Sequence, residues 1–79
     1  MYIKVTDVEY RGQYRLCCTF NDGSVKIIDM SPVLDAPAFR ELRDIDKFRQ
    51  FGFDETVFWA NGADIAPEWL YSNGVPSQD

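Results

Sequence analysis

Residues 59–65 form the most site-like segment of the sequence, because they place an amide, a carboxylate and an indole around one glycine. A strand is expected to end at Asn61-Gly62 and a short helix to follow, so the segment spans a strand-to-helix junction. Such junctions often hold ligands, since unpaired backbone N–H groups and the positive end of a helix meet there. One hypothesis is therefore a small-ligand pocket, with a lining of Trp59, Asn61, Asp64 and Trp69.

The same residues also have a structural interpretation that needs no ligand. Asn61-Gly62 supplies the backbone conformation of a turn, and the Asp64 carboxylate accepts hydrogen bonds from the first N–H groups of the helix. Both tryptophans then pack in the core. We favour this interpretation, and we keep as candidate contacts for a ligand or partner Trp59, Asn61, Gly62, Asp64 and Glu68.

Catalytic chemistry has little support in the composition, because the chain contains no histidine. This excludes the commonest general base, the Ser-His and Cys-His nucleophile systems, and zinc sites that contain histidine. The carboxylates follow no calcium-loop spacing and no pattern that brings two of them within catalytic reach. Cys17 and Cys18 are adjacent on an expected strand and point to opposite faces, which disfavours a disulfide or metal clip between them. We expect no enzymatic activity, no cofactor and no bound metal.

The net charge of −5 is concentrated in the last third of the chain. Residues 1–50 hold all eight Lys and Arg together with eight Asp and Glu, whereas residues 51–79 contain no basic residue. The cations are interleaved with carboxylates, which disfavours direct binding of nucleic acid. An acidic end is better suited to a basic protein partner. The acidic residues of this last third are Asp54, Glu55, Asp64, Glu68 and Asp79.

A length of 79 residues limits the chain to one small domain that folds alone or as a small homo-oligomer. We expect this domain to span residues 1–72, with a frayed tail at residues 73–79. No apolar segment approaches the roughly 18 residues of a membrane span, and the N-terminus lacks a signal-peptide run. The two cysteines are interpreted as reduced packing residues, so we expect a cytoplasmic location and no membrane partner.

The first thirty residues predict a three-stranded antiparallel meander. Asp22-Gly23 is typical of a two-residue type I′ turn, which would pair Phe20 with Val25. A second tight turn is expected at Arg11-Gly12. Pairing should end or bulge near Asp7, because the register places this charge on the apolar face. That face would consist of Ile3, Val5, Cys18, Phe20, Val25 and Ile27, with Cys17 and Ile28 on the opposite, mostly wet face.

The rest of the chain predicts short helices, a second hairpin and a short C-terminal helix, so the fold class is α+β. Helices are expected to start at Ser31-Pro32 and at Asp35-Ala36-Pro37, and Asp44 should cap a third helix over residues 45–50. Phe39, Leu42, Ile45 and Phe48 mark their buried sides. A hairpin follows, with a turn at Asp54-Glu55 and with Val57 and Trp59 on one face and Phe58 on the other. The last helix should begin at Asp64 or Ala66 and end at Asn73-Gly74.

Four motifs in this order resemble a family of short bacterial proteins, the domain-of-unknown-function family 2442. They are Val-Thr-Asp-Val at residues 5–8, Phe-x-Asp-Gly at 20–23, Asp-x-Ser-Pro-x-Leu-x-x-Pro-x-Phe at 29–39, and Trp-x-Asn-Gly-Ala-Asp-Ile-x-Pro-Glu-x-Leu-Tyr at 59–71. We call the last of these the closing motif. The chain departs from the family at Ala60, where proline is usual, and at Ala66, where aspartate is usual. The second change weakens a helix cap.

The resemblance implies an α+β fold and supplies no catalytic activity. Members of the family resemble accessory halves of two-gene modules, encoded beside another small protein and sometimes joined to a helix-turn-helix domain. Our leading hypothesis is therefore a non-catalytic interaction module, an antitoxin-like or regulatory partner of a small basic protein encoded nearby. The alternative is a small-ligand-binding domain with its pocket around Trp59, Asn61 and Asp64.

Overall fold

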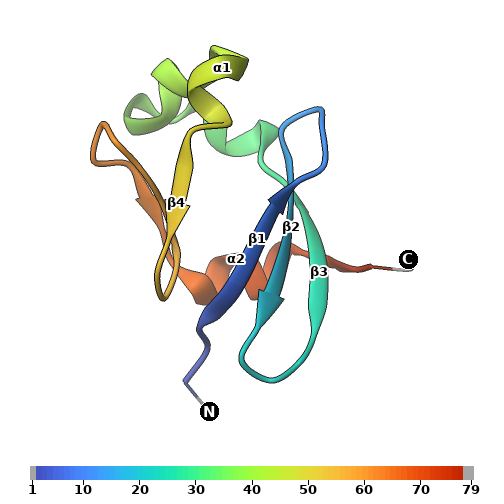
Figure 1. Cartoon of the computed structure of the whole chain (residues 1–79). Helices are drawn as coiled ribbons and strands as arrows, with labels where there is room; N and C mark the ends of the chain where they lie inside the picture. Colours follow the sequence, from blue (N-terminus) through green and yellow to red (C-terminus); the bar gives the residue numbers. More distant parts are fainter. Residues whose placement is uncertain (1, 78–79) are drawn as a thin grey trace.

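Two antiparallel sheets joined by a run of short helices make up the computed structural model, which describes residues 2–77. Sheet A has the strand order β1-β2-β3-β7, and sheet B has the order β4-β5-β6. Figure 1 shows the connecting helices at one end of both sheets and α2 behind β1. The expected α+β class, the second hairpin and the short C-terminal helix are confirmed.

Along the chain, the first three strands of sheet A come first, all of sheet B follows, and the last strand returns to sheet A. Sheet A consists of β1 (Val5–Tyr10), β2 (Arg15–Phe20), β3 (Val25–Asp29) and β7 (Val75–Pro76). Three short helices follow β3: the 3-10 helices η1 (Ser31–Asp35) and η2 (Pro37–Arg43), and the α-helix α1 (Ile45–Phe48). Sheet B then consists of β4 (Phe51–Phe53), β5 (Val57–Trp59) and β6 (Asp64–Ile65), and α2 (Pro67–Asn73) returns the chain to sheet A.

The turn between β2 and β3 is one residue longer than the sequence predicts. The Phe20 N–H donates to the Ser24 carbonyl at 2.9 Å, and Gly23, with φ +87°, is the last of three loop residues. Val25 therefore pairs with Thr19 and not with Phe20. A shift of one residue moves every side chain to the other face of a strand. Ile28 is accordingly fully buried, while Val25 is 38% exposed on the outer face of the sheet.

The turn between β1 and β2 also differs from the expected one. It is centred on residues 12–14, where Gln13 and Tyr14 both have positive φ, and the Arg15 N–H donates to the Gly12 carbonyl at 3.0 Å. Left-handed backbone is costly for residues other than glycine. Here it is offset by tertiary packing, because the Tyr14 ring meets Phe48 at a centroid distance of 5.1 Å. The turn at Arg11-Gly12 was therefore a wrong prediction.

The irregularity expected near Asp7 is confirmed. The register of β1 against β2 shifts between Val5 and Asp7, so that Val5 lies opposite Phe20 and Val8 lies opposite Cys18. The bulge places Asp7 opposite Thr19, with its carboxylate exposed to solvent. It thereby keeps the valines on the core side and the charge off it.

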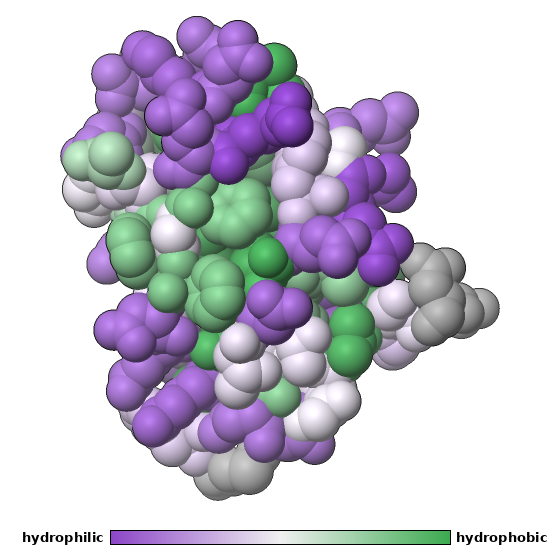
Figure 2. All heavy atoms as spheres, viewed as in Figure 1, coloured by the Kyte–Doolittle hydropathy of each residue, from purple (hydrophilic) through white to green (hydrophobic). Residues whose placement is uncertain are grey.

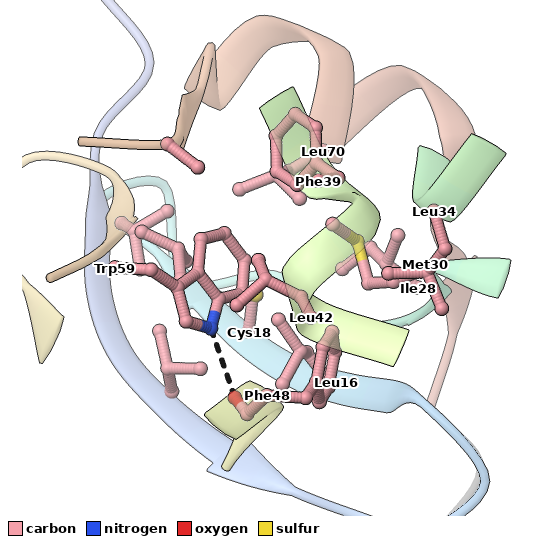
Figure 3. Packing of buried hydrophobic residues seen from close by; sticks show 14 of the residues in the cluster. Leu16, Cys18, Ile28, Met30, Leu34, Phe39, Leu42, Phe48, Trp59 and Leu70 are labelled. Carbon is pink, nitrogen blue, oxygen red and sulfur yellow. Dashed lines mark hydrogen bonds between the residues drawn. The ribbon is translucent and has the colours of Figure 1, made fainter. Parts of the chain in front are cut away.

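The core draws on both sheets and on every helix (Figure 3). Phe39, Leu42 and Phe48 are buried as expected, but Ile45 is 37% exposed. The four-residue helix α1 has only one inward-facing side, and Phe48 occupies it. The fully buried side chains of the core include Leu16, Cys18, Phe20, Ile28, Met30, Val57 and Leu70. Cys17 and Cys18 point to opposite faces of β2 and are both free thiols.

Only one of the expected helix caps is formed. The Asp44 carboxylate accepts a hydrogen bond from the Asp46 N–H at 3.0 Å, which confirms Asp44 as the cap of α1. Ser31 lies inside η1 and donates its own N–H to Asp29, so it is no cap. Asp35 pairs with the Arg43 guanidinium, with 2.5 Å between Oδ1 and Nη2. The last helix begins after Ala66, one of its two predicted starts, and has no side-chain cap.

Part of the expected C-terminal tail forms structure. Val75 pairs with Ile27 as part of β7, and the Ser77 N–H donates to the Val25 carbonyl at 2.9 Å. Residues 75–77 are thus a fourth strand of sheet A with its continuation, while residues 78–79 lie outside the described part of the chain. Gly74 permits this return, because a Cβ there would lie 2.8 Å from the Lys26 Cβ.

Candidate functional site

Trp59 lies in the core and is only 3% exposed. Its indole Nε1 donates to the Phe48 carbonyl at 2.9 Å, which Figure 3 draws as a dashed line. The ring also meets Phe39 edge-on at 5.7 Å between centroids. A buried tryptophan needs a partner for its N–H, and α1 supplies one here. Trp59 therefore has the role that the structural interpretation gave it.

Asn61 and Gly62 form the turn from β5 to β6. Gly62 has φ +90°, and the Ala63 N–H donates to the Asn61 side-chain oxygen at 3.0 Å. The Asn61 side chain also contacts η2, because its Nδ2 donates to Glu41 Oε2 at 3.0 Å. The turn is thereby fastened to η2. Gly62 itself is the exposed apex of the turn.

A hollow of about 320 Å³ opens beside this turn, between η2, α1 and β5. Trp59 and Asn61, two of the residues predicted for a pocket, line it, whereas Asp64 and Trp69 do not. Lys47 Nζ lies 3.8 Å from Glu41 Oε1 at the hollow, so one cation and one anion face it together. The full lining is Glu41, Leu42, Lys47, Gln50, Trp59, Ala60 and Asn61. Glu41 and Lys47 were not predicted as site residues, because no local spacing in the sequence places η2 against residue 61.

Asp64 lies in β6 and caps no helix, which corrects the sequence prediction. It pairs with Phe58 in the register of sheet B, so the two side chains share one face. Phe58 covers Gly52, where a Cβ would meet its ring at 2.8 Å, and remains 43% exposed. Figure 2 shows apolar residues gathered around β4, with hydrophilic side chains above and below them.

The acidic residues of the last third separate into paired and unpaired ones. Glu55 lies 3.6 Å from Lys4 Nζ. Asp54, Asp64 and Glu68 are exposed, and within residues 2–77 their side chains form no ion pair or hydrogen bond. Thr56 donates its hydroxyl to the Ile65 carbonyl, which holds the end of β6 beside the turn that carries Asp54. We call Asp54, Phe58, Asp64 and Glu68 the acidic surface.

Two ionisable groups show how the fold shifts pKa values. Burial in the core, with the neighbouring Cys17, raises the pKa of the Cys18 thiol to about 12, so this thiol stays protonated. Hydrogen bonds from Ser24 and from the Tyr71 hydroxyl lower the pKa of Asp22 to about 2. The second contact fastens the β2–β3 turn to α2. Within residues 2–77, no group of three or more Cys, Asp or Glu side chains is placed to hold a metal ion.

The fold and its surface define a small single-domain α+β protein. The chain belongs to the family described as a protein of unknown function, DUF2442, whose pattern it matches over residues 5–76. No curated protein and no solved structure matches the chain. Among the described residues, no helix has the length and apolar character needed to cross a membrane.

Proposed function

We propose that this protein is a non-catalytic interaction module that docks a cationic partner protein on the acidic surface. One observation carries the proposal: the side chains of Asp54, Asp64 and Glu68 form no ion pair within residues 2–77, and Asp64 lies opposite Phe58, whose side chain is 43% exposed. Elsewhere, Lys4 and Arg43 are paired with carboxylates of the same chain. Asp54 and Asp64 therefore hold negative charge that no cation within residues 2–77 neutralises, and Glu68 adds a third carboxylate from the first turn of α2.

The chemistry of this surface favours a basic protein over other partners. Unpaired carboxylates steer a positively charged partner and accelerate its association. The ring of Phe58 offers an aromatic anchor that a folded partner can bury, and aromatic side chains carry much of the binding energy in protein interfaces. This chemistry, with the two-gene setting that the family resemblance implies, supports an antitoxin-like or regulatory role beside a small basic protein encoded nearby.

Association kinetics with the partner that co-purifies from the native host test the proposal. The first variant neutralises the acidic surface by Asp54→Asn, Asp64→Asn and Glu68→Gln. Association should slow and lose much of its dependence on salt, because the steering charge is gone. A matched control makes the same change in net charge on sheet A and α1, with Asp7→Asn, Glu9→Gln and Asp46→Asn.

The control variant should associate nearly as fast as the wild type. Equal slowing in both variants would show that only net charge matters, and unchanged kinetics in the first would remove the acidic surface from the interface. Phe58→Ala tests the apolar part separately, since loss of a buried anchor should raise the dissociation rate more than it changes the association rate.

A further inference from the structure

The hollow beside the β5–β6 turn combines an apolar floor with a rim that carries both signs of charge. Leu42 and Trp59 are almost fully buried and form the floor with Ala60. Glu41 and Lys47 stand at the rim, and their side chains are 58% and 56% exposed. A volume of about 320 Å³ lies near the small end of known ligand pockets. The space therefore suits a small metabolite with an apolar part.

The two charged groups at the rim are only loosely engaged with each other. Lys47 Nζ and Glu41 Oε1 are 3.8 Å apart, which is longer than a hydrogen bond. By contrast, Glu41 Oε2 is held in place by the Asn61 amide at 3.0 Å. The ammonium of Lys47 has three donors, and no hydrogen bond within residues 2–77 engages them. The rim thus offers a positioned carboxylate and, beside it, an ammonium that forms a long ion pair but no hydrogen bond within residues 2–77.

We propose that this hollow binds a free amino acid with an apolar side chain. The carboxylate of the ligand pairs with Lys47, its ammonium pairs with Glu41, and its side chain covers the floor at Leu42 and Trp59. A singly charged ligand is disfavoured, because a lone anion lies beside Glu41 and a lone cation lies beside Lys47. A ligand that carries both charges on groups attached to the same carbon atom satisfies Lys47 and Glu41 at once.

This site is separate from the acidic surface in both place and chemistry. It opens at the β5–β6 turn, whereas Asp54 lies at the β4–β5 turn at the other end of the same hairpin. None of the side chains of the acidic surface lines the hollow. The proposed binding of an amino acid can therefore be tested independently of the proposed protein partner.

Titration with L-leucine tests the proposal on the intact chain. Trp69→Phe leaves Trp59 as the only indole, so its fluorescence reports the hollow, and amide shifts in a nitrogen-15 spectrum locate the binding. We expect saturable binding of leucine. Isoamylamine, which lacks the carboxylate, and 4-methylpentanoate, which lacks the amine, should each bind at least about tenfold more weakly, the loss of one charge-assisted contact. Glycine, which lacks the apolar side chain, should bind more weakly as well.

Two variants test which residue pairs with which charged group of the ligand, and a third variant serves as the control. Lys47→Gln should remove the advantage of leucine over the amine, and Glu41→Gln should remove its advantage over the acid. Arg40→Gln changes an exposed residue of η2 that does not line the hollow and should leave affinity unchanged. Two results on the wild-type chain would overturn the proposal: no saturable amide shift at millimolar leucine, or equal affinity for leucine and either analogue. Neither result depends on how the variants fold.

Discussion

The register of β3 can be tested by truncating two neighbouring isoleucines. Ile28 is fully buried in the core, whereas Ile27 lies on the outer face between Cys17 and Val75 and is only partly covered. Ile28→Ala should therefore cost about 3 kcal/mol of unfolding free energy, within the range for buried Ile-to-Ala changes. Ile27→Ala should cost about 1 kcal/mol, because its side chain is only half-buried and lies outside the core. The register predicted from the sequence gives the opposite order.

Urea titration followed by tryptophan fluorescence measures both costs. A chain of this length has about 4–12 kcal/mol of stability in total. With a slope of about 1 kcal/mol/M, Ile28→Ala should lower the midpoint by roughly 3 M and Ile27→Ala by roughly 1 M. If the first variant does not fold, Ile28→Val should still cost about 1 kcal/mol and Ile27→Val less than about 0.5. The observed register would be refuted if the Ile27 variants lost as much unfolding free energy as the Ile28 variants.

Three further predictions follow from local contacts. Gly74→Ala should cost about 1–3 kcal/mol in urea titration, because its Cβ would lie 2.8 Å from the Lys26 Cβ, whereas Ser72→Ala should cost less than about 0.5. The unfolding free energies of Asp64→Ala and Asp64→Asn should both lie within about 0.5 kcal/mol of the wild-type value. A loss of stability in the Ala variant alone would instead support the predicted role of Asp64 as a helix cap. The folded-state pKa of Asp22 lies near 2, below its ordinary value of 3.8, so its stabilising effect holds above pH 3.8 and fades as pH falls toward 2. Asp22→Asn should flatten the fall in melting temperature across that window, and an unchanged slope would contradict the assignment.

Local signals predicted those parts of the fold that local forces decide. Asp44 caps α1 because a carboxylate next to free N–H groups needs no distant partner. The hairpin of β4 and β5 follows from alternation, with Val57 and Trp59 inside and Phe58 outside. These features depend on a few consecutive residues, which is why the sequence alone was sufficient.

The register of the meander depended on distant contacts instead. A glycine with positive φ at position 23 suits both a two-residue and a three-residue turn, so Asp22-Gly23 did not decide between them. The choice is made by Ile28 and Met30, which alternate into the core only in the longer turn. Tyr14 is similar: its left-handed backbone is held by Phe48, a residue 34 positions away in the chain. The hollow escaped prediction for the same reason, since Glu41 and Asn61 meet only in the folded chain.

The closing motif, which carries most of the resemblance to the family, separates into two groups of residues in the structure. Most of its members have contacts that account for them: Trp59 donates to a buried carbonyl, Gly62 adopts positive φ, and Leu70 fills the core. Asp64 is different, because it is exposed, is unpaired within residues 2–77 and caps no helix, whereas Glu68 lies in the first turn of α2, where a negative charge favours the helix. A motif whose other members are explained by folding leaves the Asp64 carboxylate as the one that folding does not require. Its position opposite Phe58 is the reason to look for the partner on this face of sheet B.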